Sequence, residues 1–242
     1  HKEECPVTDN DDGTYLVSVV PQQLAQHHLS ITVNGEHIKD SPFTLDIVPQ
    51  RDYALMKEPS QNITGIDSPK YIAFCDNGDM FVTSDGDHCI FVYDKSGHKK
   101  DIFGFKGTGE LQFQSPRGID ISNGVVYVAE YEGHRIHMLT TGGEFIGTFG
   151  EKGSGIGQFD IPRDVKISPD GRVYVVDNGN QCVQVFNPDW SISHVIDRSS
   201  VPEGDFNNPR AMAFDFSSNV HVTNASIAVV VFTPTGQFIR HY

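Results

Sequence analysis

A repeat of 46 or 47 residues constrains the fold of this chain more than any other feature of its sequence. A proline recurs at spacings of 47, 46 and 47, at Pro69, Pro116, Pro162 and Pro209. A basic residue follows each proline, namely Lys70, Arg117, Arg163 and Arg210. Other columns keep the same step, such as Phe113, Phe159 and Phe206, or Ile90, Ile136, Val183 and Val229. A repeat of this length indicates one supersecondary unit used several times, as in solenoids and propellers.

Within one copy, apolar residues alternate with a period of two, which indicates β-strands. Each copy divides into four short strands, the last of which ends at Phe103, Phe149, Ile196 or Tyr242. Four antiparallel strands cannot bury both faces alone, so the copies must stack on one another. We therefore predict an all-β chain with a four-bladed β-propeller region at residues 64–242, its blades at 64–104, 105–150, 151–197 and 198–242. The aromatic column that contains Phe145 and Phe149 is expected to pack between blades.

The copies from Phe113 to Ile136 and from Phe159 to Asn180 resemble NHL repeats. Each has a proline near its start, a glycine turn, an apolar strand and an acidic residue, and Arg135-Ile136 continues the NHL pattern in the first. The arginine of this pattern survives only as Arg135, and Asn224 replaces the acidic residue in the last copy. The resemblance covers residues 64–242 and implies an NHL-type propeller. Because such propellers close with about six blades, we expect the four blades to be part of an incomplete ring.

Residues 1–48 follow a different pattern. Their strictly alternating apolar residues and the Asn34-Gly35 dipeptide predict half-buried antiparallel strands and a tight hairpin. The segments Gly13-Thr14-Tyr15 and Ser41-Pro42-Phe43 resemble the latter half of a filamin-type immunoglobulin-like repeat. Such a sandwich normally takes about 100 residues, so we expect a partial filamin-like β-sandwich. Residues 49–63 show neither periodicity and are predicted to be a linker.

A filamin-like sandwich followed by NHL repeats resembles the C-terminal region of the TRIM-NHL proteins. The resemblance implies an E3 ubiquitin ligase whose propeller recruits targets for ubiquitin-dependent degradation. The RING, B-boxes and coiled coil of that family are absent from this chain, so we expect it to have no ligase chemistry of its own. It would be a non-catalytic module that binds a substrate or scaffold protein on one propeller face. Open blade edges, or a coiled coil outside this chain, are also expected to allow self-association.

The charge of the chain bears on the choice of partner. Lys and Arg number 18 and Asp and Glu 32, for a formal net charge of -14, which disfavours nonspecific binding to nucleic acid and suits a basic partner. The ring of Lys70, Arg117, Arg163 and Arg210 is the candidate binding site. One hypothesis is that these residues are structural and pair with an acid of a neighbouring blade, such as Asp120, Asp164 or Asp215. The others are that they bind a protein or, as in some TRIM-NHL propellers, a specific single-stranded RNA.

An enzymatic role is a further hypothesis, because some propellers of similar shape are metal-dependent hydrolases or lyases. It has little support here, since we interpret His88 and His134 as exposed turn residues, and His27 and His28 point to opposite faces of a strand. No cofactor, metal site, catalytic residue or membrane segment is therefore predicted. Cys5, Cys75, Cys89 and Cys182 lack the spacing of zinc ligands or of a disulfide framework. Reduced thiols and a cytoplasmic location are the simplest interpretation.

Overall fold

The computed structural model describes residues 63–202, 206–225 and 229–242, together with six short strands among the first 46 residues. The chain divides into two compact units, residues 1–60 and residues 61–242. Among the described residues, Cys75, Cys89 and Cys182 are free thiols, whereas Cys5 lies outside the described part. None of the helices in the described ranges is long and apolar enough to cross a membrane.

The N-terminal unit contains three antiparallel pairs of strands. Strand β1 (Val7–Asp9) pairs with β2 (Tyr15–Val17), and β3 (Gln26–Leu29) pairs with β6 (Phe43–Asp46). Strands β4 (Thr32–Val33) and β5 (Glu36–His37) pair Val33 with Glu36, the register of a two-residue hairpin loop. The predicted hairpin at this point is therefore confirmed.

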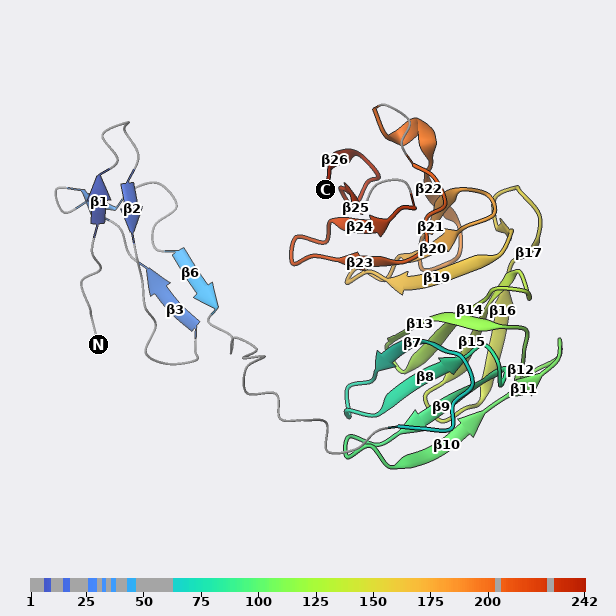
Figure 1. Ribbon diagram of the computed structural model, residues 1–242. Helices are drawn as coiled ribbons and strands as arrows, with labels where there is room; N and C mark the ends of the chain where they lie inside the picture. The colour runs from blue at the N-terminus through green and yellow to red at the C-terminus, as the bar shows by residue number, and fades with distance from the viewer. Residues whose placement is uncertain are drawn as a thin grey trace. The chain divides into compact units, whose positions relative to one another are not determined.

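Four four-stranded antiparallel sheets make up the second unit, and each follows the order of its strands in the sequence (Figure 1). Sheet 1 comprises β7 (Pro69–Phe74), β8 (Met80–Ser84), β9 (Cys89–Tyr93) and β10 (Lys99–Phe103). Sheet 2 comprises β13 (Pro116–Ser122), β14 (Val125–Glu130), β15 (Arg135–Thr140) and β16 (Phe145–Phe149). Sheet 3 comprises β19 (Pro162–Ile167), β20 (Val173–Asp177), β21 (Cys182–Phe186) and β22 (Ile192–Ile196). Sheet 4 comprises β23 (Met212–Phe214), β24 (Val220–Thr223), β25 (Val229–Phe232) and β26 (Phe238–His241). The predicted all-β fold is confirmed, with four strands in each of the four copies.

Two small parallel sheets connect the first three blades, and the sequence did not indicate them. Strand β11 (Phe105–Lys106) pairs with β12 (Gln112–Phe113), and β17 (Glu151–Lys152) pairs with β18 (Gln158–Phe159). Glycine is required just before each pair. Gly104 and Gly150 have φ values of 85° and 93°, and a Cβ at either position would lie 2.3 or 2.4 Å from the following Phe113 or Phe159 ring. A 3₁₀ turn, η2 (Arg198–Ser200), lies in the described part of the corresponding connection after sheet 3.

Most of the hydrophobic core lies between successive sheets, although one buried cluster, made of Val82, Cys89, Phe91 and Tyr93, belongs to sheet 1 alone. Sheet 1 contributes Phe81 and Ile90 to a buried cluster that also contains Ile119 and Val128 of sheet 2. Equivalent clusters join sheet 2 to sheet 3 and sheet 3 to sheet 4. This is the packing expected of stacked propeller blades, in which each repeat buries its face against its neighbour.

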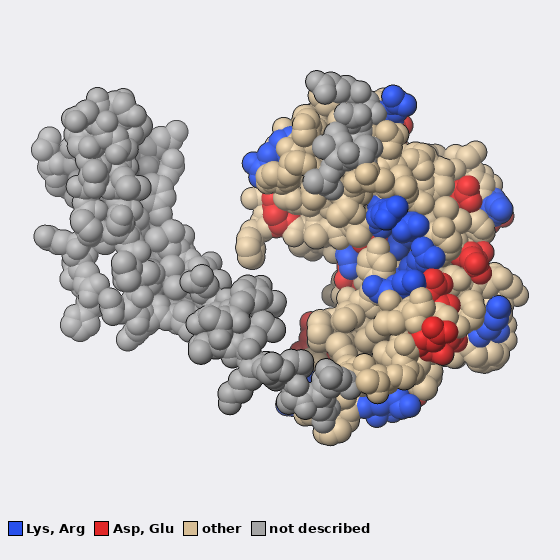
Figure 2. All heavy atoms as spheres, in the orientation of Figure 1, with Lys and Arg blue, Asp and Glu red and all other residues tan. Residues whose placement is uncertain are grey.

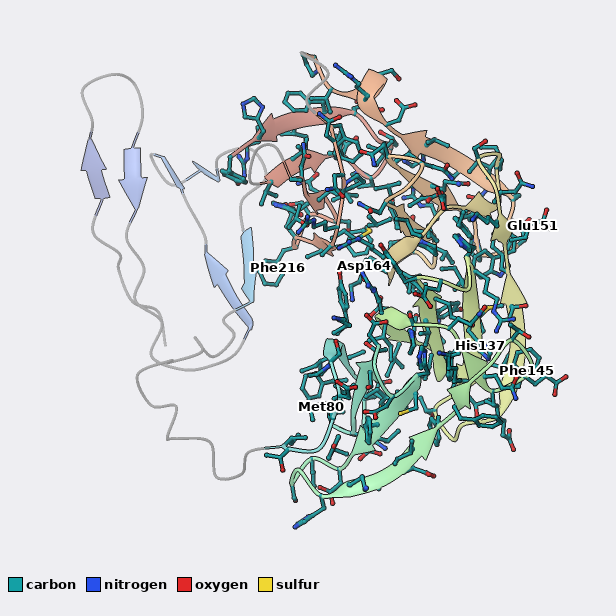
Figure 3. All side chains as sticks on the ribbon, turned by 45° about the vertical axis from the view of Figure 1, so that its right-hand side comes forward. Met80, His137, Phe145, Glu151, Asp164 and Phe216 are labelled. Carbon is teal, nitrogen blue, oxygen red and sulfur yellow. The ribbon has the colours of Figure 1, made fainter. Side chains whose placement is uncertain are left out.

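The two aromatic residues assigned to this packing behave differently. The Phe149 ring stacks on Trp190 at 4.1 Å and meets the Phe186 ring edge-on at 5.1 Å, so it joins sheet 2 to sheet 3 as expected. The Phe145 ring instead contacts His137 of its own sheet at 5.1 Å, and Figure 3 shows the two side chains together. Phe145 is the first residue of β16 and Phe149 is the last, so the two rings lie at opposite ends of this strand. Only the Phe149 end packs against the rings of sheet 3.

A repeated hydrogen bond also joins neighbouring blades. The Nδ1 atoms of His88 and His134 accept the backbone N–H of Ser115 and Ile161, respectively, each at 3.1 Å. Gln181 accepts the N–H of Asn208 in the same way. His88 and His134 are turn residues, but they are half-buried rather than exposed, which corrects the sequence interpretation. Their rings are held at the interface because each supplies an acceptor to the next blade.

Candidate functional site

The four repeated basic residues lie at the start of the first strand of each sheet. Lys70, Arg117 and Arg163 are the second residues of β7, β13 and β19, and Arg210 precedes β23 by two residues. Strand β13 packs against both β7 and β19, so these first strands lie side by side around the centre of the unit. We call these four residues the central cation cluster. Figure 2 shows Lys and Arg side chains gathered where the sheets meet.

Tyr71 shows that the cluster converges. Its hydroxyl donates a hydrogen bond to the backbone oxygen of Arg210 at 3.1 Å, which connects sheet 1 to sheet 4. Burial raises the pKa of Tyr71 to about 12, and the charge of Asp164 also raises it, whereas Arg163, Arg117 and Arg210 lower it. One phenol therefore lies within electrostatic range of three arginines from three different sheets.

Arg117 is fixed by contacts on two sides. Its Nη2 atom lies 3.1 Å from Oδ2 of Asp85 in sheet 1, and Nζ of Lys70 lies 3.5 Å from the same oxygen. Its guanidinium carbon lies 3.5 Å from the centre of the Tyr131 ring, a cation–π contact. The contact with Asp85 is an ion pair between neighbouring blades, the kind expected of a structural role for this column.

The acids suggested for such pairing are engaged elsewhere. Asp120 accepts the backbone N–H of Ile167 at 2.7 Å, and Asp164 accepts those of Val165 and Met212, each at 2.9 Å. Asp215 accepts hydrogen bonds within its own turn and from His221. The partner of Arg117 is therefore Asp85, whereas Asp120 and Asp164 bond to the backbone of a neighbouring blade and Asp215 stabilises its own turn.

Arg163 differs from Arg117 in having no neutralising partner. Its side chain makes no hydrogen bond or ion pair to the residues that the structure describes, and its Nε atom is buried without a partner. The nearest aromatic contact is with Tyr131, whose ring centre lies 5.4 Å from the guanidinium carbon. Arg210 is exposed. The cluster thus contains one half-buried guanidinium whose charge is not balanced locally.

Asp164 lies at the centre of the unit between the sheets (Figure 3). Its side chain is 1% exposed, and burial raises its pKa to about 7 against a weaker opposing effect of Lys166, whose Nζ atom is 4.0 Å away. Strand β13 passes close to this residue at Gly118. A Cβ on Gly118 would lie 2.3 Å from the Cα atom of Asp164, so this approach requires glycine. Asp164 joins sheet 3 to sheet 4 through the N–H of Met212.

The sequence analysis did not assign the residues that hold the cluster to this role: Asp85 was interpreted as an exposed turn residue, and Tyr131 was not considered. Asp85 and Tyr131 occupy the same repeat position, five residues before Ile90 and Ile136, and Asn178 occupies it in sheet 3. Asn178 contacts the next blade through the backbone oxygen of Pro209 at 2.8 Å. Position in the repeat could have identified this column, but its chemistry changes from carboxylate to phenol to amide. A search for recurring residue types therefore passed over it.

Other buried polar groups stabilise the blades. Glu130 accepts hydrogen bonds from the backbone N–H of Gln114 at 2.9 Å and from Nε of Arg135 at 2.8 Å, and it also contacts Nδ1 of His137 at 2.9 Å.

In the part of the chain that the structure describes, no three His, Cys, Asp or Glu side chains gather as metal ligands would. At the other end of β13, two open hollows of about 470 and 420 Å³ lie beside Ile121, Ser122 and Asn123.

Fold and repeats define the class of protein: NHL repeats in a β-propeller fold, preceded by a filamin repeat. A family model described as Filamin/ABP280 repeat matches residues 1–44, and the NHL repeat model matches residues 113–138 and 159–186. The curated relatives include E3 ubiquitin-protein ligase TRIM71 of Mus musculus, 30% identical over 97 residues, which are 40% of this chain and 11% of that protein. TRIM71 of Xenopus tropicalis is 32% identical over 102 residues, 42% of this chain and 12% of that protein. The resemblance to the TRIM-NHL family is confirmed, and the chain matches about a tenth of the length of these relatives.

Solved structures support the same fold. The nidogen/laminin complex contains a chain that superposes with a TM-score of 0.59 at 16% identity, covering 84% of this chain and 68% of that one. The streptogramin B lyase structure gives a TM-score of 0.57 at 18% identity, with coverages of 74% and 56%. At these identities the likeness concerns the propeller architecture alone.

Proposed function

We propose that this chain is a non-catalytic module that recruits a protein, either a substrate or a scaffold, for a TRIM-NHL E3 ubiquitin ligase in ubiquitin-dependent degradation. The central cation cluster is the proposed contact surface. Its chemistry suits binding, because a guanidinium keeps its charge at every physiological pH and does not transfer protons. A cytoplasmic location and a ring of about six blades remain predictions that accompany this proposal.

The observation that carries the proposal is the preorganised geometry of the cluster. Arg117 is held between Asp85 and the Tyr131 ring, and the strands that position it are packed against each other. A rigid surface loses little conformational entropy when a partner binds. Arginine and tyrosine are also both enriched among the interface residues that contribute most to affinity.

Single-stranded RNA is the second candidate ligand, since the cluster presents one cation from each blade. Proteins that bind such RNA combine cations with aromatic rings whose faces are free to stack on bases. Here Arg117 covers the Tyr131 ring at 3.5 Å, and the chain carries a net charge of -14. Both features favour a protein partner over RNA.

Crosslinking tests the two candidates together. The chain, carrying a photoreactive group, would be incubated with a cell extract as wild type, as the triple variant Arg117→Ala/Arg163→Ala/Arg210→Ala, and as a control triple variant. The control, Lys106→Ala/Lys152→Ala/Arg198→Ala, removes the same charge from three exposed sites. We expect proteins captured by wild type and control to be lost from the cluster variant. Capture of RNA in place of protein, lost in the same variant and with added salt, would establish the alternative; capture that is equal in all three chains would refute a role for the cluster.

Self-association through open blade edges is part of the same proposal. Its support is the exposed face of sheet 1, where Ile72 and Phe74 are 53% and 66% exposed. Sedimentation of the wild type and of Phe74→Ser at rising concentration tests it. We expect the wild type to form larger species as its concentration rises and Phe74→Ser to remain smaller.

A further inference from the structure

The starting observation is an unbalanced charge at Arg163. Its guanidinium is half-buried, its Nε atom is buried without a partner, and none of its five N–H groups bonds to a residue that the structure describes. Charges removed from water are ordinarily paired, because desolvation of a lone ion is costly. An anion supplied from outside the chain would remove this cost.

A second guanidinium group, that of Arg117, lies near the same aromatic ring as Arg163. Arg117 also has a buried Nε atom without a partner, and both guanidinium carbons approach the Tyr131 ring, at 3.5 Å for Arg117 and 5.4 Å for Arg163. Both guanidinium groups therefore lie close to one aromatic ring. Planar guanidinium groups bind carboxylates through two parallel N–H···O bonds, which gives both strength and orientation.

The surroundings of the site distinguish a single carboxylate from a long polyanion. Asp85 already occupies one side of Arg117, and Asp67, Asp87 and Glu132 are exposed on the adjoining loops. A nucleic acid strand places a phosphate at every nucleotide, so several of its charges would pass these carboxylates within a Debye length of about 8 to 10 Å. A peptide can place one negative group at the cluster and neutral residues beside the acids.

We propose that Arg163, together with Arg117, binds the side-chain carboxylate of a single Asp or Glu residue that is flanked by neutral residues in the partner protein. Exposed Arg210 supplies further attraction from sheet 4. This inference rests on the proposed function and specifies the chemistry of the segment that is bound. The site is locally positive although the whole chain is acidic, so it selects for a localised negative group.

The test uses the full chain and a labelled Gly/Ser peptide with one central Glu, measured by fluorescence anisotropy. The matched peptide carries Gln at the same position. We expect the Glu peptide to bind wild type at least tenfold more tightly than the Gln peptide, and Arg163→Ala to abolish this preference. Arg163→Lys keeps the charge but lacks the fork, so it should recover only part of the affinity. Lys152→Ala, which removes an exposed cation of β17 outside the central cation cluster, should bind as wild type does.

Three results would overturn the inference. They are equal binding of the Glu peptide by wild type and Arg163→Ala, binding of the Gln peptide as tightly as the Glu peptide, and no binding of either peptide by a chain whose cooperative unfolding shows it to be folded. A labelled oligouridine that binds through Arg163 and is not displaced by the Glu peptide would also overturn it, in favour of RNA. If extract proteins are captured through the cluster but the Glu peptide does not displace them, this inference fails while the proposed function stands.

Discussion

Strands β7 and β13 have the same place in their repeats but opposite environments. Ile119 of β13 is fully buried, whereas Ile72, the equivalent residue of β7, is 53% exposed. Strand β13 packs against sheet 1, while the described residues place no sheet against the corresponding face of β7. The comparison shows that a repeat determines the strand, and that the neighbouring blade determines whether the strand belongs to the core.

A different contrast concerns the polar residue that ends the second strand of each sheet, which is fully buried in both sheet 1 and sheet 2. In sheet 2, Glu130 is fully buried and binds the backbone of Gln114 and the side chains of Arg135 and His137. In sheet 1, Ser84 instead bonds to the backbone oxygen of Asp67 at 2.6 Å and to Asp87 at 2.8 Å. A buried charge network in one blade is thus replaced by a neutral hydroxyl in another.

The largest expected effect comes from breaking this network. Glu130→Ala leaves Arg135 and His137 without their buried acceptor and should lower the free energy of unfolding by about 3–5 kcal/mol. Ser84→Ala removes a neutral donor and should cost about 1 kcal/mol. Urea unfolding of both variants measures the difference. Equal losses would show that the two blades are held in the same way.

The comparison of β7 with β13 gives the next prediction. Ile119→Ala opens a cavity between sheets 1 and 2 and should destabilise the chain by about 2–5 kcal/mol. Ile72→Ala removes a side chain that is already half in water, so a cost below about 1 kcal/mol is expected. Thermal unfolding compares the matched pair. A large effect at Ile72 would mean that a further element covers β7 in solution.

Asp164 distinguishes sheet 3 from sheet 2, which has Gly118 at the same repeat position. Its buried carboxyl group allows this difference to be tested by changing the pH. Burial raises the pKa of Asp164 from 3.8 to about 7, so between pH 4 and 7 the folded chain retains a proton that the unfolded chain releases. Stability contributed by this residue therefore falls as pH rises across that range, by at most about 1.4 kcal/mol per pH unit.

Asp164→Asn should flatten this part of the stability profile in urea unfolding at successive pH values. Some slope of the same sign should persist, because burial also raises the pKa of Asp177, to about 6. Glu144→Gln, which changes an exposed carboxylate, is the control. An unchanged slope in Asp164→Asn would contradict the assignment.

The smallest effect concerns the residue that precedes each repeated proline. Ser68, Ser115 and Asn208 have φ values of 52°, 56° and 52°, and Ile161 has 51° at the equivalent position of sheet 3. A β-branched residue is strained in this region, whereas asparagine tolerates it. Ile161→Asn should therefore raise the free energy of unfolding by about 0.5–1 kcal/mol. Ser115→Asn, made as a control, should change it by only a few tenths.

Much of the fold could be predicted because its causes are local. Alternating apolar residues and turn glycines specify the four strands of a repeat, and the constant step aligns the copies. Strands β11 and β17 escaped prediction because each is two residues long, and their pairing depends on a ring packed against Gly104 or Gly150. Such a contact leaves no periodic signal in the sequence.

The candidate site was predictable to a smaller extent. Repetition placed Lys70, Arg117, Arg163 and Arg210 around a common centre, and the structure brings the three arginines near Tyr71. The repetition in the sequence could not show that Arg117 is paired while Arg163 is not. That difference arises because Asp85 and Tyr131 follow equivalent strands but carry different side chains, which only the packing of one blade on the next makes visible.

The hydrogen bond from Tyr71 to the backbone of Arg210 has a consequence for the mechanics of the molecule. It connects the first and fourth sheets at the residue whose side chain belongs to the cation cluster. If the anion proposed above binds more tightly when this hydrogen bond is made, then binding would favour the joined arrangement of the two sheets, and the joined arrangement would favour binding by the same factor. A ligand at the centre would in that case hold the first and last sheets together.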